Sequence, residues 1–321
     1  MLRSMLAAAL TATVAFAAPA LAQDFPNRTV TLVIPFAAGG STDLVGRLIA
    51  ERMTQELGQT VVVENKGGAG GNLGASQVAK ATPDGYTMLM GTVATHSINP
   101  ALYKKMPYDP VTSFAPISLL AIVPNVLVVT PSFPAKTTEE LIALLKKDPG
   151  KYSYASSGNG TPLHLSGEMF KSMAGVDMQH IPYQGAGPAL IDVLSGQVPI
   201  MFDNLPSSSA HIKSGKLRAL GVTTAKRATS FPDIPAIAEA IPGYETYTWN
   251  ALFAPAGTPP EVIAKLNAAA NKALKDPKVQ ARLADFSATP VGSTPEELGT
   301  HVKNELAKWA PIVKASGAQL D

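Results

Sequence analysis

The sequence predicts an α/β protein of two domains, each a central sheet flanked by helices. Short β-branched runs alternate with amphipathic stretches at the spacing of βαβ units, which is typical of parallel sheets. A strand, a glycine loop and a helix follow one another at residues 29–57, and this pattern recurs at residues 152–173. Two long apolar passages, residues 114–129 and 247–257, flank the middle of the chain, as expected for crossings between domains.

The first 22 residues have the features of a secretory signal peptide. Arg3 gives a positive start, residues 6–17 are apolar, and Ala20-Leu21-Ala22 has the small-x-small pattern of a cleavage site. The apolar run is too short to favour a membrane span, and no other segment is long and apolar enough. We therefore expect the mature chain to be soluble and periplasmic.

Composition excludes several classes of function. Charged residues make up 16% of the chain and the net charge is +2, so no basic stripe exists to hold nucleic acid. The chain has no Cys, which fits a periplasmic protein that needs no disulfide. It has no HExxH or His-x-Glu pattern, and we expect neither a metal ion nor a cofactor. About 300 mature residues, rich in apolar side chains, suggest two domains with sizeable cores.

The first strand–loop–helix is the stretch that we expect to bind a ligand. Residues 29–34 form the strand, and Gly39 and Gly40 leave room for a ligand to approach the backbone. Ser41 or Thr42 is expected to cap the helix, which ends at Gly58. Free N–H groups and the positive end of the helix dipole converge there, which favours an anion. From these residues alone, a tight turn without a ligand is equally compatible.

A second set of elements follows with a strand at 61–65, a glycine-rich loop at 66–72, a helix at 73–81 and a strand at 86–90. The loop matches neither a P-loop nor a dinucleotide fingerprint, because no Lys-Ser/Thr follows and Leu73 replaces the third glycine. We interpret it as a structural turn. Thr92 and Thr95 come after the next strand and could face a cleft at the carboxyl ends of the strands. His96 is interpreted as a packing residue.

The second half of the chain repeats the opening pattern with different residues. Ser156–Gly160 is a loop of glycines and hydroxyls, and Thr161 is expected to cap a helix with Pro162 in its first turn. Asp203 ends a strand and could either accept from a ligand or hold the neighbouring loop. His164, His180 and Trp249 are interpreted as packing residues. The remaining expected elements are strands at 179–183, 198–202 and 217–222 and helices at 137–147, 189–195, 260–274 and 295–315.

The chain resembles the Bug-type solute-binding receptors of tripartite tricarboxylate transporters. The motifs that carry the resemblance run in order along the mature chain, at 35–43, 58–65, 67–72, 83–87, 99–100, 108–110, 156–161, 180–185, 215–220 and 254–259. The helix start at 44–47 is a variable part of the pattern. His180-Ile-Pro-Tyr-Gln184 stands where the family usually has His-Val-Pro-Tyr-Lys. Gln184 removes a cation near the cleft and leaves the class of acid open.

The resemblance implies a two-domain periplasmic binding protein, a type II-like clamshell with its ligand between the domains. We expect domain 1 at 23–124 plus 246–321 and domain 2 at 125–245, joined by hinge strands at 123–126 and 244–251. The implied ligand is a small organic acid, with a dicarboxylate favoured, and the implied partners are the membrane subunits of a transporter; a monomer is expected. The residues implied to bind the ligand are Ala38, Gly39, Gly40, Ser41, Thr42, Asp43, Thr92, Thr95, Ser156, Ser157, Gly158, Asn159, Gly160, Thr161 and Asp203.

Two other functions compete with a receptor. A secreted serine hydrolase acting on a small ester or amide would need a nucleophile, but the chain has no Gly-x-Ser-x-Gly elbow. Neither loop has a His at triad positions evident in the sequence, although a triad can assemble from distant residues. A structural envelope protein would have no use for two exposed helix N-termini. The sequence therefore favours a receptor without catalytic activity.

Overall fold

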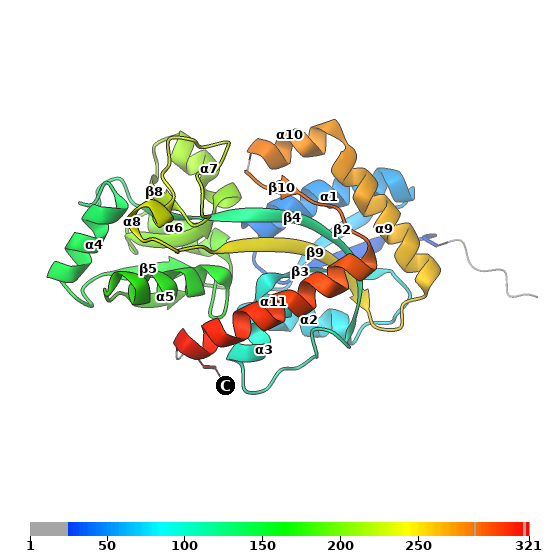
Figure 1. Ribbon diagram of the computed structural model, residues 1–321. Coiled ribbons are helices and arrows are strands. Elements are labelled where there is room, and N and C mark those ends of the chain that lie inside the picture. The colour runs from blue at the N-terminus through cyan, green and yellow to red at the C-terminus, as the bar shows by residue number, and fades with distance from the viewer. Residues whose placement is uncertain (1–24, 286, 317–318, 321) are drawn as a thin grey trace, which may run out of the picture.

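The computed structural model describes residues 25–285, 287–316 and 319–320, so the expected signal peptide lies outside the described residues. One sheet of ten strands runs through the molecule (Figure 1). Its neighbour order is β2-β1-β3-β9-β4-β7-β5-β6, while β8 and β10 both pair with β4. The strands are β1 (Val30–Ile34), β2 (Val61–Asn65), β3 (Thr87–Thr92), β4 (Phe114–Val129), β5 (Ser153–Ser156), β6 (Gln179–Pro182), β7 (Ile200–Asn204), β8 (Arg218–Val222), β9 (Tyr247–Pro255) and β10 (Thr289–Pro290).

Helices cover both faces of the sheet (Figure 1). They are α1 (Ser41–Leu57), α2 (Asn72–Ala79), α3 (Asn99–Leu102), α4 (Thr138–Lys147), α5 (Pro162–Ala174), α6 (Ala186–Leu194), α7 (Leu205–Lys213), α8 (Ile237–Ala240), α9 (Pro260–Lys275), α10 (Pro277–Asp285) and α11 (Pro295–Ser316). Two short turns, a 3-10 turn at Ala69–Gly71 and a π-helical turn at Ala94–Ile98, complete the set. The predicted α/β class is confirmed, and β1 pairs in parallel with β2 and β3, as β5 does with β6 and β7.

Strands β4 and β9 tie the two ends of the molecule together (Figure 1). The first part of β4 pairs with β9, with Val123 opposite Thr248 and Pro124 opposite Tyr247. One residue later β4 changes partner, and Asn125 lies opposite Asn204 of β7. The sheet is therefore continuous from end to end. We call the part built on β1, β2, β3 and β9 lobe 1 and the part built on β5, β6, β7 and β8 lobe 2.

Each lobe has a hydrophobic core on both faces of its part of the sheet. In lobe 1, α1, α9 and α10 pack on one face and α2, α3 and α11 on the other. In lobe 2, α6 and α7 cover one face and α4, α5 and α8 the other. Trp249 and Trp309 are fully buried, and both indole N–H groups donate to Glu305 Oε2, at 3.0 and 3.1 Å. The packing role expected of Trp249 is thus confirmed.

The structure corrects the expected start of one helix and adds a helix that was not expected. The predicted helix at 189–195 is α6 and begins earlier, at Ala186. Helix α7 was not predicted, because its serine run resembles a loop, yet Asn204 is its N-cap and Pro206 lies in its first turn. Both missed starts lie at the carboxyl ends of strands, which is where open α/β sheets bind ligands. No described helix has the length and apolarity to span a membrane.

Candidate ligand-binding site

The first glycine loop folds back on itself through Asp43. The N-cap of α1 is Gly40, which makes no side-chain cap, so the prediction that Ser41 or Thr42 caps the helix was wrong. Asp43 Oδ2 accepts the Gly39 N–H at 3.0 Å, and Arg47 and Asn65 also donate to this carboxylate. Burial raises the pKa of Asp43, but these hydrogen bonds outweigh it and hold the pKa below its ordinary value. The carboxylate of Asp43 therefore holds the loop and its neighbouring side chains in place.

The second glycine loop is closed by the predicted cap. Thr161 Oγ1 accepts the His164 N–H at 3.3 Å and donates to Gly158 O at 2.7 Å. Gly158 has φ +135°, and a Cβ there would lie 2.8 Å from Tyr183 O. Ser156 Oγ, which is buried, accepts the Gly158 N–H at 3.2 Å. These bonds hold the loop before α5 against lobe 1, where Gly160 lies beside Leu102.

Two stacked histidines support this loop from behind. The rings of His164 and His180 lie 4.1 Å apart at 18° to each other. Gly160 N–H donates to His164 Nδ1 at 3.2 Å, and Ser156 Oγ lies 2.7 Å from His180 Nε2. Burial lowers the pKa of His164 to about 4 and that of His180 to about 3. Both rings are therefore neutral near pH 7 and act as hydrogen-bonded packing, as the sequence indicates.

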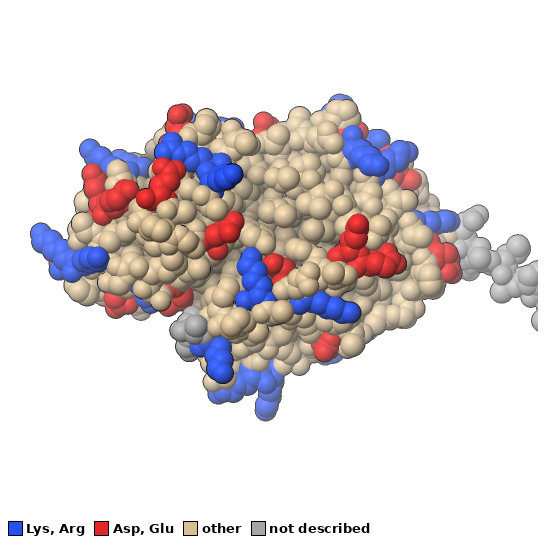
Figure 2. All heavy atoms as spheres, in the orientation of Figure 1, with Lys and Arg blue, Asp and Glu red and all other residues tan. Residues whose placement is uncertain are grey.

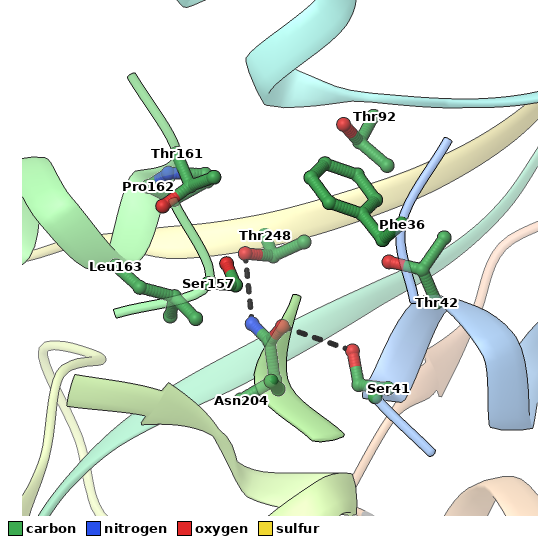
Figure 3. A pocket seen from close by; sticks show the side chains of 12 residues that line it. Phe36, Ser41, Thr42, Thr92, Ser157, Thr161, Pro162, Leu163, Asn204 and Thr248 are labelled. Atoms are coloured by element: carbon green, nitrogen blue, oxygen red, sulfur yellow. Dashed lines mark hydrogen bonds between the residues drawn. The ribbon is translucent and has the colours of Figure 1, made fainter. Parts of the chain in front are cut away.

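The loops meet at a cavity between the lobes, and none of the described residues that line it is charged (Figure 3). In this closed arrangement its volume is about 20 Å³, which is room for about one water-sized group. Strand ends of both lobes and the first turns of helices form its wall. The lining residues are Phe36, Gly40, Ser41, Thr42, Thr92, Ser157, Thr161, Pro162, Leu163, Ala186, Asn204 and Thr248.

Four helices begin at this cavity. Gly40–Thr42 start α1 in lobe 1, while Thr161–Leu163, Ala186 and Asn204 start or cap α5, α6 and α7 in lobe 2. Helix N-termini present unpaired N–H groups and partial positive charge. A cavity with four of them and no charged lining residue is suited to an anion held by neutral donors. Among the described residues, no group of three His, Asp or Glu could hold a metal ion.

The lobes already touch each other around the cavity. Ala37 N–H of lobe 1 donates to Gln184 O of lobe 2 at 3.0 Å. Ser41 Oγ donates to Asn204 Oδ1 at 3.0 Å, a contact that Figure 3 draws as a dashed line. A Cβ on Gly40 would approach the Ala186 Cβ to 3.4 Å. The structure therefore has closed lobes.

The structure places the residues expected at the site in three groups. Gly40, Ser41, Thr42, Thr92, Ser157 and Thr161 line the cavity. Ala38, Gly39 and Gly160 lie where the lobes touch, while Gly158 and Asn159 line a neighbouring cavity that shares Phe36 and Ser157. Asp43, Thr95, Ser156 and Asp203 do not line the cavity: the hydroxyl of Thr95 accepts the Thr92 N–H, for example, and Asp203 holds α7.

Asp203 holds the first turn of α7 from a buried position. Ser207 and Ser208 each donate a hydroxyl to Asp203 Oδ2 at 2.6 Å. Burial raises the pKa of Asp203 to about 6 even though these bonds lower it. Of the two roles that the sequence left open, the contacts of Asp203 are those of a residue that positions its neighbouring segment.

Sequence reasoning missed half of the lining. The six lining residues that were not predicted to bind a ligand are Phe36, Pro162, Leu163, Ala186, Asn204 and Thr248. Asn204 with Pro206 two residues later was a signal for a helix start that could have been used. Thr248 offered no local signal, because it reaches the cavity only through the pairing of β9 with β4.

A two-lobed α/β fold with a neutral, anion-suited cavity at the strand ends of both lobes defines a solute-binding protein. The sequence model of TctC, described as the Tripartite tricarboxylate transporter family receptor, matches residues 45–318. The chain belongs to this family, which confirms the resemblance noted from its motifs.

Solved structures support the same class. The periplasmic binding protein BugD is 42% identical, with a TM-score of 0.89 over 92% of this chain and 99% of that one. Rpa4515 of R. palustris with adipate is 42% identical, with a TM-score of 0.90 over 92% and 100%. MatC from Rhodopseudomonas palustris with bound malate is 38% identical, with a TM-score of 0.86 over 90% and 100%. The clamshell expected from the sequence is thus confirmed at the level of fold.

Proposed function

We propose that this chain is a periplasmic receptor that captures a small organic carboxylate between its lobes and delivers it to the membrane subunits of a tripartite tricarboxylate transporter. The observation that carries the proposal is the neutral cavity at the start of four helices. Membership of the receptor family supports the role in transport. The expected signal peptide and the similarity to the periplasmic binding protein BugD support a periplasmic location.

Neutral donors are sufficient to hold a carboxylate here. A hydrogen bond to a charged group contributes roughly 1.5–3 kcal/mol, and a helix dipole adds about 0.3–1 kcal/mol. Two such bonds with a dipole would supply about 3–7 kcal/mol by the same values. Because no lining residue is charged, binding needs no ion pair that water and salt would weaken.

We favour a dicarboxylate as the ligand. Lobe 1 offers the start of α1, and lobe 2 offers the starts of α5, α6 and α7, so each lobe can hold one carboxylate. The two relatives with bound acids hold adipate and malate, which are both diacids. A diacid held by both lobes also favours their closed arrangement, which supports capture by a monomer.

A receptor rather than a hydrolase accounts for the serines. Ser156 lies beside His180, but its hydroxyl is fully buried and also bonds to Gly158, so this contact closes the loop. Ser157 lines the cavity beside neutral donors. The family and its solved relatives are solute-binding proteins, and we propose that this chain likewise releases its ligand unchanged.

Calorimetry with adipate, malate and their monomethyl esters tests the proposal. A diacid should bind at least about tenfold more tightly than its ester, which corresponds to about 1.4 kcal/mol for one lost charged contact. Gly40→Val should abolish binding, because its side chain would meet Ala186 across the closed lobes.

Lys66→Ala is the matched control. Lys66 is half-exposed, pairs with Glu64 at 2.9 Å and does not line the cavity, so the affinity should stay within about twofold. Equal affinity for acid and ester would refute the two-carboxylate arrangement. Absence of binding across a wider panel of carboxylic acids, followed by thermal shift, would refute the receptor itself.

A further inference from the structure

Four polar atoms beneath the cavity make no hydrogen bond. They are Thr92 Oγ1, both amide atoms of Asn250, and Asn125 Nδ2. Thr92 is 2% exposed, and the other two side chains are fully buried. Buried polar groups in proteins nearly always have a partner, so four unpaired atoms in one row are able to bind a further hydrogen-bonding group.

The sheet register puts these atoms side by side. Thr92 of β3 lies directly opposite Asn250 of β9, so their side chains share one face of the sheet and are neighbours. Thr248 lies two residues before Asn250 on the same face and lines the cavity. Asn125 joins this row because its Oδ1 accepts from Thr248 Oγ1 at 3.1 Å and from Asn204 Nδ2 at 2.6 Å.

The row opens into the cavity at Thr92. Thr92 and Phe36 both line the cavity (Figure 3), and the Thr92 hydroxyl oxygen is buried behind this lining. Although Thr92 and Asn250 face each other across the two strands, neither hydrogen bonds to the other. A third group placed between them could satisfy both.

The chemistry of the row selects that group. The Asn250 amide offers donors and an acceptor, and the Thr92 hydroxyl can act as either. A carboxylate only accepts hydrogen bonds, so it would leave Asn250 Oδ1 unpaired and repel it. An alcohol donates and accepts at once, which makes it the complementary neutral partner.

We propose that Thr92 and Asn250 form a hydroxyl subsite, and that the physiological ligand is a hydroxy-substituted organic acid whose alcohol oxygen occupies it. This inference rests on the proposed receptor function and deepens it by naming a hydroxyl group as the substituent that the site recognises. An ordered water could supply the same hydrogen bonds. The experiment therefore has to separate an alcohol on the ligand from a water that fills the subsite with any ligand.

Calorimetry with pairs of acids that differ only by one hydroxyl tests the subsite. Malate against succinate and 3-hydroxyadipate against adipate are suitable pairs. In at least one pair, the native chain should bind the hydroxy acid at least about tenfold more tightly than the plain acid. Thr92→Val and Asn250→Leu, which keep size but remove the polar atoms, should each bring this ratio close to one.

Ser97→Ala is the matched control, since Ser97 Oγ is also buried and unpartnered but does not line the cavity. It should leave the ratio unchanged. Equal affinities within every pair would show that a water fills the subsite and overturn the proposal. Equal losses for both acids in Thr92→Val and Asn250→Leu would show a structural role and overturn it too. If neither acid of any pair binds, the result contradicts the proposed receptor function on which the subsite depends.

Discussion

At the scale of residues, neutrality is the common property of the site. Asp43 is nearest to the first glycine loop, but Arg47, Asn65 and Gly39 occupy its oxygens. The histidines behind the second loop are neutral near pH 7 because burial lowers their pKa. The lining residues thus keep their charge state over the pH range in which organic acids are ionised.

Acid should destabilise the fold through its buried histidines. The pKa is lowered to about 4 for His164 and to about 3 for His180, so below pH 6.5 the unfolded chain binds protons that the folded chain excludes. The free energy of unfolding should fall from pH 6.5 toward pH 4, by up to about 1.4 kcal/mol per pH unit for each histidine. Asp203, with a pKa raised to about 6, acts in the opposite direction between pH 3.8 and 6.

Urea unfolding between pH 7 and 4.5 measures this dependence. A His164→Gln variant should show a flatter dependence on pH than the native chain, because one of the excluded protons is lost. Parallel curves for the two proteins would contradict the assignment to His164.

At the scale of elements, the starts of four helices line the cavity. These starts were harder to predict from the sequence than the strands. Strand β4 was predicted with its observed bounds, because an apolar β-branched run is a local property. The cap of α5 was also correct, since Thr161 followed by proline is a local signal. The cap of α1 was wrong, because the Ser41 hydroxyl bonds instead to Asn204, which lies 163 residues further along the chain.

The lining could be predicted only where one loop supplies it. Thr92 and Thr161 follow strands of their own lobes, so βαβ spacing places them at the cleft. Asn204 and Thr248 reach the cavity through the change of partner along β4, which no local pattern encodes. The same holds for Ala186, which contacts the first loop only when the lobes meet.

Removing the cap of α5 should weaken both fold and binding. Thr161→Ala loses the bond to the His164 N–H and the bond to Gly158 O, which should cost about 1 kcal/mol of stability and loosen the loop at the cavity. The acid affinity should fall at least severalfold. Chemical unfolding and calorimetry on the same variant measure the two effects.

Thr137→Ala removes the matched cap of α4, where Thr137 Oγ1 accepts the Glu140 N–H at 3.2 Å far from the cavity lining. It should cost similar stability with unchanged affinity. An equal loss of affinity in both variants would mean that the effect is one of general stability.

At the scale of the whole molecule, the two crossings on one continuous sheet define how the lobes can move. We propose domain boundaries near 124/125 and 245/246, where β4 changes partner and β9 begins. On the face shown in Figure 2, acidic and basic side chains are interspersed and form no basic stripe, which fits a small-molecule partner. The closed contacts include two hydrogen bonds, Ala37 N–H to Gln184 O and Ser41 Oγ to Asn204 Oδ1, beside the close approach of Gly40 to Ala186.

Ligand should close the lobes in solution. We expect the empty chain to sample open arrangements with bending at 123–126 and 244–251, because β4 and β9 are the two described strands that run between the lobes. Small-angle scattering should show a smaller radius of gyration with a saturating diacid. Gly40→Val, which obstructs closure, should keep the larger value with and without the acid. An unchanged radius in the native chain would indicate a rigid site.

The pairing of β4 with β9 at the crossing has a mechanical consequence. Two strands joined by hydrogen bonds behave as a ribbon, which resists shear in its plane and bends more easily across it. The lobes therefore cannot slide past each other, and their relative position reduces to essentially one angle. An acid of a different length is expected to alter that angle, because its two carboxylates would contact opposite lobes. A membrane subunit that contacts both lobes would then distinguish bound acids by the angle between the lobes, without contacting the acid itself.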